Sequence, residues 1–292
     1  MLGKLIKHDF KSLSRVLIPT NLAILGATII MTMGIAFNVK ESVNSAVQNS
    51  SMTLLRVITV LMSVTMGIAI FAALFLVAFI IFQRFYKSFM SDEGYLTFTL
   101  PVTTTQLLWS KLITAMLWTI ISSVAIFICF NIFILFGTAS TGIVNTWIYS
   151  EAAKEIHEFI LDGARLTVPI IEFIVLSIVS TAKSILHVYL AIIIGGIVSQ
   201  KHKILFAILF FFAISIALTT LTSIAQYFLG TGFAYSMEFN GVMNPTDAAE
   251  AFNYFVSVGQ PYFWFYFVFT LAITATFFVL SRYFLKNKLN LD

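Results

Sequence analysis

The chain has 292 residues, of which 59% are hydrophobic and only 10% carry a charge. Soluble globular domains carry about a quarter charged residues, so this composition, with a mean hydropathy of +0.96, excludes an ordinary soluble domain and indicates a membrane protein. The formal charge of +4 does not indicate nucleic-acid binding, because the basic residues gather at the ends of apolar runs, where they set membrane orientation. The single cysteine, Cys129, excludes a disulfide framework.

Residues 1–15 predict an amphipathic helix that lies in the membrane interface. One helical face carries apolar side chains and the basic side chains lie mostly off it: Leu2, Leu5, Ile6, Phe10 and Leu13 against Lys4, Lys7, Lys11 and Arg15. Such a helix turns its cations toward lipid headgroups. A cleaved signal peptide is disfavoured, because the apolar region that follows is too long and no convincing small-residue cleavage site comes after it.

Six apolar stretches are each long enough to cross a bilayer, which takes about 20 residues. They lie at about residues 16–38, 54–83, 110–136, 168–199, 204–229 and 259–284. The sequence therefore predicts an all-α polytopic membrane protein, with six transmembrane helices in a single transmembrane domain.

The distribution of positive charge predicts that both termini are cytoplasmic. In that orientation twelve Lys or Arg residues lie in inside segments and four lie outside, namely Lys40, Arg56, Lys154 and Arg165. Cytoplasmic segments of membrane proteins carry the excess of Lys and Arg. Residues 84–109 then form a cytoplasmic loop, and residues 138–167 and 230–258 form external loops.

The cytoplasmic loop is predicted to be structured. The acidic, glycine-containing turn at residues 92–94 interrupts the apolar run, and Pro101 disfavours a helical conformation at Leu100. One of the three threonines at residues 103–105 can cap the helix that follows. We expect a short helix around residues 89–97, a bend at Pro101 and a capped restart.

This loop is either a plain connecting hairpin or a docking site for a soluble protein. Its length and its apolar Tyr95, Phe98 and Leu100 favour docking, because apolar groups exposed at a surface mark interaction sites.

The external loops are expected to contain short helices. Residues 147–162 place apolar side chains at helical spacing, with the acids mostly off that stripe. Residues 230–235 are apolar but interrupted by glycine, which suits a re-entrant segment. The run at residues 244–247 (Asn-Pro-Thr-Asp) predicts a helix start, and a short helix through about residue 255 should follow.

A polar stripe lies on one face of the fourth span: Ser177, Ser180, Lys183, Ser184 and His187. A lysine within a span usually faces a cavity or the bundle interior, so the stripe can line a substrate path or contact a second subunit. Alternatively, Lys183 snorkels toward the outer surface or pairs with Glu172. Both interpretations remain open. On the same span, Gly195 and Gly196 permit close helix contact.

Catalytic motifs are absent from the sequence. It contains no P-loop, HExxH, GxSxG or GxGxxG motif, and its four histidines are scattered among different segments without metal-ligand spacing. We therefore expect no enzyme activity, no catalytic residue, no metal site and no directly bound cofactor.

The chain resembles the membrane-spanning permease subunits of type-2 ABC exporters of the Gram-positive bacterial type. The specific part of the resemblance is Asp92-Glu-Gly-Tyr-Leu-Thr-Phe-Thr-Leu-Pro, followed by Leu107-Leu-Trp-Ser-Lys111. The interfacial N-terminal helix, the six spans, the Tyr189-Leu-Ala-Ile-Ile-Ile-Gly-Gly run and the tail Lys288-Leu-Asn-Leu-Asp match in architecture. The resemblance covers the whole chain.

The resemblance implies a place in the bacterial cell membrane and a mechanism. Residues 91–99, here named the coupling segment, would sit in a cleft of a separate ATPase subunit, with Asp92, Glu93, Gly94, Tyr95, Leu96 and Phe98 as its contacts. Two ATPase copies would bind ATP and Mg²⁺. A second permease subunit, identical or related, would complete a dimer that exports an amphipathic peptide, drug or lipid-like molecule.

Two other classes remain as alternatives. A non-transporting membrane sensor or immunity protein would act by binding alone. An ion-coupled secondary transporter would use intramembrane acids or broken helices, for which only Glu172 and Lys183 are available.

Overall fold

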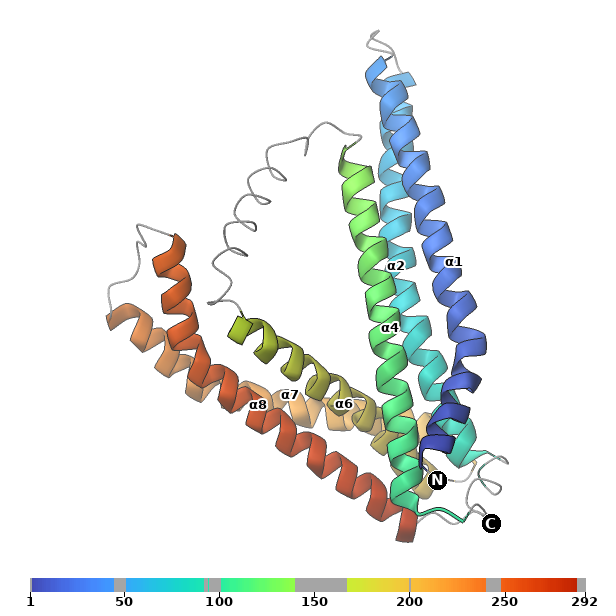
Figure 1. Cartoon of the computed structure of the whole chain (residues 1–292), viewed down its shortest axis with the longest axis vertical. Helices are drawn as coiled ribbons and strands as arrows, with labels where there is room; N and C mark the ends of the chain where they lie inside the picture. Colours follow the sequence, from blue (N-terminus) through green and yellow to red (C-terminus); the bar gives the residue numbers. More distant parts are fainter. Residues whose placement is uncertain are drawn as a thin grey trace. The chain divides into compact units, whose positions relative to one another are not determined.

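A computed structural model describes residues 2–44, 51–91, 94, 101–139, 167–199, 201–239 and 248–287. Its long elements are six helices (Figure 1): α1 (Leu2–Asn44), α2 (Ser51–Met90), α4 (Thr104–Ala139), α6 (Thr167–Val198), α7 (Lys203–Phe239) and α8 (Ala248–Asn287). Within these ranges there is no β-strand, which confirms the predicted all-α class.

All six helices contain a stretch long and apolar enough to cross a membrane. The shortest has 32 residues and the longest 43, so they extend about 48–65 Å at 1.5 Å per residue, beyond the roughly 30 Å of hydrocarbon in a bilayer. Large apolar side chains lie on their surface, including Ile30 (73% exposed) and Phe71 (74% exposed). Such surfaces are stable against lipid rather than water, which indicates a multi-pass membrane protein.

The N-terminal segment is continuous with the first span. The sequence predicts a separate helix at residues 1–15, whereas residues 2–15 form the first turns of α1, with no helix end before the apolar run. No glycine or proline separates the two parts; Pro19 comes four residues after Arg15, inside the helix. Leu13 on this segment and Leu17 just after it are buried.

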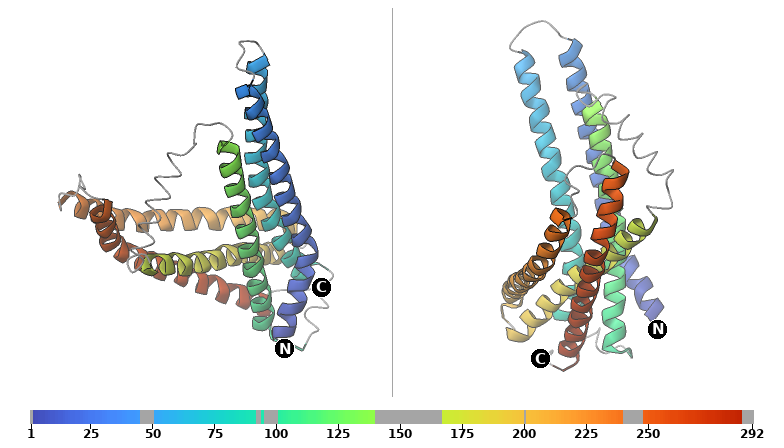
Figure 2. Two further views of the ribbon diagram at one scale, coloured as in Figure 1. Left: turned by 45° about the horizontal axis from the view of Figure 1, so that its top comes forward. Right: turned by 90° about the vertical axis from the view of Figure 1, so that its left-hand side faces the viewer.

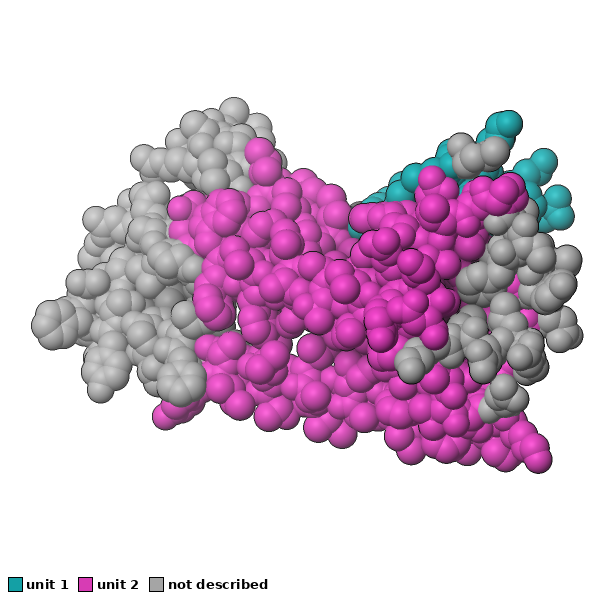
Figure 3. All heavy atoms as spheres, turned by 90° about the horizontal axis from the view of Figure 1, so that it is seen from below, with its two compact units in different colours: residues 1–84, 113–166 teal, residues 85–112, 167–292 magenta. Residues whose placement is uncertain are grey.

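The chain forms two compact units (Figure 3). Unit 1 comprises Met1–Arg84 and Ile113–Leu166. Within it α1, α2 and α4 lie side by side (Figure 2). Asn21 Nδ2 of α1 donates a buried hydrogen bond of 3.0 Å to Ser122 Oγ of α4, and the ring of Phe10 stacks on Trp118 with centroids 4.9 Å apart. These contacts join α1 to α4.

Unit 2 comprises Phe85–Leu112 and Thr167–Asp292. In this unit α6 packs against both α7 and α8. The unit also contains the last turns of α2 and the first turns of α4, so the two sides of the cytoplasmic loop predicted at residues 84–109 belong to the same body as α6–α8.

The structure changes the predictions for the external loops. Residues 230–235 continue α7 without a break as far as Phe239, so the predicted re-entrant segment is wrong; glycine within a helix costs only about 1 kcal/mol relative to alanine. A helix does follow residue 247, as predicted, but it is α8 itself and not a short helix ending near residue 255. The helix predicted at residues 147–162 lies outside the described residues.

Candidate functional site

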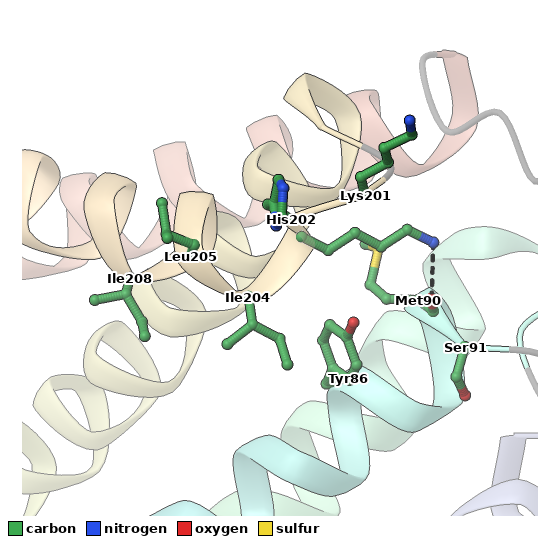
Figure 4. Close-up of a pocket in the computed structure, with 9 residues that line it drawn as sticks. Tyr86, Met90, Ser91, Lys201, His202, Ile204, Leu205 and Ile208 are labelled. Atoms are coloured by element: carbon green, nitrogen blue, oxygen red, sulfur yellow. Dashed lines mark hydrogen bonds between the residues drawn. The ribbon is translucent and has the colours of Figure 1, made fainter.

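A cavity of about 620 Å³ lies in unit 2, between the end of α2 and the start of α7 (Figure 4). Tyr86 and Met90 of α2 and Ser91, the residue directly after α2, line one side of it. Residues 201–205 and Ile208 line it from the turn after α6 and from the first turns of α7. This feature is named the α2–α7 cavity. Its lining includes Ser91, the first residue of the coupling segment.

Lys203 connects the two sides of this cavity. Its Nζ donates a hydrogen bond of 3.1 Å to the carbonyl oxygen of Met90, the last residue of α2. The final carbonyls of a helix have no partner within the helix, and a cation near a helix C-terminus is stabilised by the helix dipole. Lys203 therefore caps α2 and holds its last residue against the start of α7.

Tyr189 of α6 contacts both sides of the connection between α2 and α4. Its ring stacks on Phe85 at the end of α2, with centroids 3.6 Å apart and an interplanar angle of 9°. Its hydroxyl donates a hydrogen bond of 3.4 Å to the carbonyl oxygen of Lys111 at the start of α4. Tyr189 is 2% exposed. One buried side chain thus connects the end of α2, where the loop begins, with the start of α4, where the loop ends.

The glycine pair near the end of α6 allows two close approaches. A Cβ atom at Gly195 would lie 2.7 Å from Cα of Ala207 in α7, and one at Gly196 would lie 2.5 Å from Sδ of Met90. Both distances are shorter than the van der Waals separation of two non-bonded atoms, so a side chain at either position would clash. The glycines therefore let α7 and the end of α2 pack directly on α6, which confirms the predicted close helix contact.

The exit side of the loop has its own local structure. Gln106 N donates to Thr103 Oγ1 at 3.3 Å, and Thr103 N donates to Gln106 Oε1 at 3.4 Å. This reciprocal pair is a capping box at the start of α4. Thr103 is therefore the capping residue among the three candidate threonines. The ring of Trp109, one turn further, lies 4.9 Å from that of Phe278 in α8.

Most of the predicted coupling contacts lie outside the described residues: Asp92, Glu93, Tyr95, Leu96 and Phe98. Gly94 is described and buried. Its N–H donates to the carbonyl of Ser91 at 2.7 Å, and a Cβ there would lie 2.8 Å from the backbone oxygen of Phe89. A larger residue at position 94 would therefore disturb the turn that follows α2.

The polar stripe on α6 does not form one polar surface. Ser177 and Ser184 are exposed and His187 is buried. Ser184 Oγ donates to the carbonyl of Ser180 at 3.0 Å, so its hydroxyl is satisfied within its own helix. The imidazole of His187 stacks on Phe211 of α7 and Phe277 of α8, with centroids 4.8 and 5.7 Å away. His187 therefore belongs to the packing of unit 2.

The predicted pairing of Lys183 with Glu172 does not occur. Both residues are described, and the described part of the chain has no ion pair between them; each is partly exposed. The prediction that Lys183 snorkels outward or faces a substrate path stays open.

Sequence reasoning does not identify Tyr189 or Lys203 as connecting residues, because their partners lie 78 and 113 residues away. An aromatic residue near the end of a span and a lysine at a helix start were the available signals. Across the described ranges, no group of three His, Cys, Asp or Glu side chains forms a candidate metal site.

Comparison with known proteins adds no relative: no protein-family description, no curated protein and no solved structure matches the chain.

Proposed function

We propose that this chain is the permease subunit of an ATP-driven ABC exporter in a bacterial membrane. It would pair with a second permease subunit and with two copies of a separate ATPase that binds ATP and Mg²⁺. Six candidate spans support this class. The sequence contains no P-loop, so ATP-driven transport would require an ATPase on another chain.

The attachment of the cytoplasmic loop to α6 carries the proposal. Phe85 before the coupling segment and Lys111 after it both contact Tyr189, while Lys203 holds Met90. Protein interiors are close-packed and transmit displacement rather than absorb it. An ATPase that pushes on the coupling segment would therefore move α6 and α7, and not only the loop.

The proposed orientation puts this end of unit 2 in the cytoplasm. Four lysines of unit 2 lie in the last turn of α2, the first turns of α4, the turn after α6 and the start of α7: Lys87, Lys111, Lys201 and Lys203. Such a gathering of cations suits a cytoplasmic face. The exposed Lys4, Lys7 and Lys11 of α1 would face lipid headgroups from the same side.

In this mechanism Asp92, Glu93, Tyr95, Leu96 and Phe98 contact the ATPase, and Gly94 provides the turn. Closure of the two ATPases would draw the coupling segments together and change the packing of the spans. The substrate would be amphipathic, such as a peptide, a drug or a lipid-like molecule. The 31 phenylalanines provide an extensive apolar surface for such a molecule.

Co-purification with candidate ATPases tests the proposal. The double variant Glu93→Arg, Leu96→Arg should reduce recovery of the ATPase at least tenfold, because it reverses a charge and inserts another in the contact. Glu250→Arg is the matched control, since it makes the same charge reversal at the predicted outer end. It should leave recovery unchanged. Unchanged association in the double variant would contradict docking through this segment.

A second variant separates docking from coupling. Tyr189→Ala leaves the coupling segment intact but removes the contact with both sides of the loop. We expect normal ATPase recovery and a several-fold loss of substrate-stimulated ATP hydrolysis in proteoliposomes. If stimulation persists in full, the loop does not act through α6.

A further inference from the structure

The polar side of the α2–α7 cavity is lined by basic residues and, among the described residues, by no acidic residue. Lys201, His202 and Lys203 contribute cationic or N–H-donating side chains, and none of the nine described lining residues is acidic. Lys203 already bonds Met90, while Lys201 and His202 are exposed at the turn. In Figure 4 these two side chains lie on the side of the cavity away from Tyr86.

The backbone adds to the positive potential of this cavity. His202 accepts the first hydrogen bond of α7, from Phe206 N at 3.2 Å, so the cavity contains the N-terminus of a 37-residue helix. The first N–H groups of a helix lack partners within it, and the helix dipole favours an anion there. The first turn of α7 carries no acidic residue that would take this place.

An apolar surface adjoins the cations. Ile204, Leu205 and Ile208 line the same cavity and are 58%, 60% and 53% exposed. They belong to a candidate membrane span, Lys203–Ala225, so their exposed atoms are suited to lipid chains. A free phosphate would use the cations and the helix N-terminus but would gain nothing from this apolar wall.

We propose that the α2–α7 cavity binds an anionic phospholipid, whose phosphate contacts Lys201, His202 and the N-terminus of α7 and whose acyl chains lie along Ile204 and Ile208. Basic pockets between membrane helices are suited to anionic headgroups. This site is independent of the proposed transport function, because it requires only that α7 crosses a membrane. An occupied site would join the end of α2 to α7 beside Lys203.

Native mass spectrometry of the full chain, titrated with phosphatidylglycerol or phosphatidylcholine, tests the site. Phosphatidylglycerol should be retained preferentially, and Lys201→Gln should weaken its binding about fivefold, the effect of about one cation near a membrane surface. Lys286→Gln is the matched control, since Lys286 is also an exposed lysine near a helix end. It should leave the binding of phosphatidylglycerol unchanged.

Two further arms identify the source of the phosphate. Ile208→Ser should weaken phosphatidylglycerol binding, and millimolar inorganic phosphate should fail to displace the lipid. Displacement by inorganic phosphate, with no effect of Ile208→Ser, would overturn the lipid assignment in favour of a free anion.

A test on the wild-type protein does not depend on the folding of any variant. A photoactivatable phosphatidylglycerol should cross-link the wild-type protein within residues 201–208, and excess phosphatidylglycerol should compete with it. Equal retention of both lipids by the wild type, or cross-links only elsewhere, would overturn the proposal.

Discussion

At the scale of single residues, Gly195 and Gly196 differ in what a larger side chain would meet. A Cβ at Gly195 would meet the backbone of Ala207, whereas one at Gly196 would meet the sulfur of Met90. A helix backbone can move only with its whole segment, but an unbranched methionine side chain adapts easily. Gly195 is therefore the stricter requirement of the two.

Gly195→Ala should lower the free energy of unfolding by about 1–3 kcal/mol, the usual cost of overpacking. Gly196→Ala should cost less, since only the side chain of Met90 has to shift. Reversible unfolding in mixed micelles measures both. Gly67→Ala is the control, because nothing lies within 4 Å of a Cβ at Gly67. Equal stability of the Gly195 and Gly67 variants would show that α6 and α7 are not in direct contact.

The predictability of these residues from sequence depends on how local their chemistry is. The glycine pair predicts close helix contact from the sequence alone, because glycine has no side chain in any context. Tyr189 was not predicted as a connecting residue. In the sequence it is one aromatic side chain in an apolar run, and only the packing of α6 brings it to Phe85 and Lys111.

At the scale of elements, the start of α4 is determined by its capping box. Thr103 and Gln106 satisfy each other's backbone N–H groups, which fixes where the chain returns to helix after Pro101. The same helix provides Lys111 to the contact with Tyr189. Loss of the cap would therefore loosen the point where the chain enters α4.

Thr103→Ala should cost about 1 kcal/mol, the typical effect of removing an N-cap side chain. Hydrogen exchange of the amides in the first turn of α4 should become faster. Thr103→Ser should restore protection, since its hydroxyl can accept the same bond from Gln106. Thr104→Ala serves as the control, because Thr104 is one position beyond the cap. Equal exchange in the two alanine variants would contradict the capping role.

The number and type of the helices follow from the sequence, but several of their ends do not. Hydropathy identified six spans because each apolar run exceeds a bilayer. Hydropathy does not show that residues 2–15 form part of α1 or that α7 continues through residues 230–235. The positions of these helix ends depend on helix propagation: once a helix has nucleated, each further residue adds a backbone hydrogen bond at low free-energy cost.

At the scale of the whole molecule, the membrane orientation can be measured through the single native cysteine. Cys129 is fully buried in α4, so Cys129→Ala provides a clean background. In intact cells an impermeant thiol reagent should label Lys40→Cys but not Lys4→Cys or Lys286→Cys. The latter two should react only after the membrane is opened. The reverse pattern would contradict the cytoplasmic placement of both termini.

The discontinuous composition of unit 2 has a consequence for biosynthesis. Residues 85–112 leave the ribosome well before their partners, because Tyr189 lies 78 residues after Lys111 and Lys203 lies 113 residues after Met90. During translation the loop between α2 and α4 is therefore made first, and its two ends are held in place later. A partner that recognises the loop only in its held form would bind finished chains and ignore truncated ones. The contact of Tyr189 would then act as a check that synthesis has passed α6.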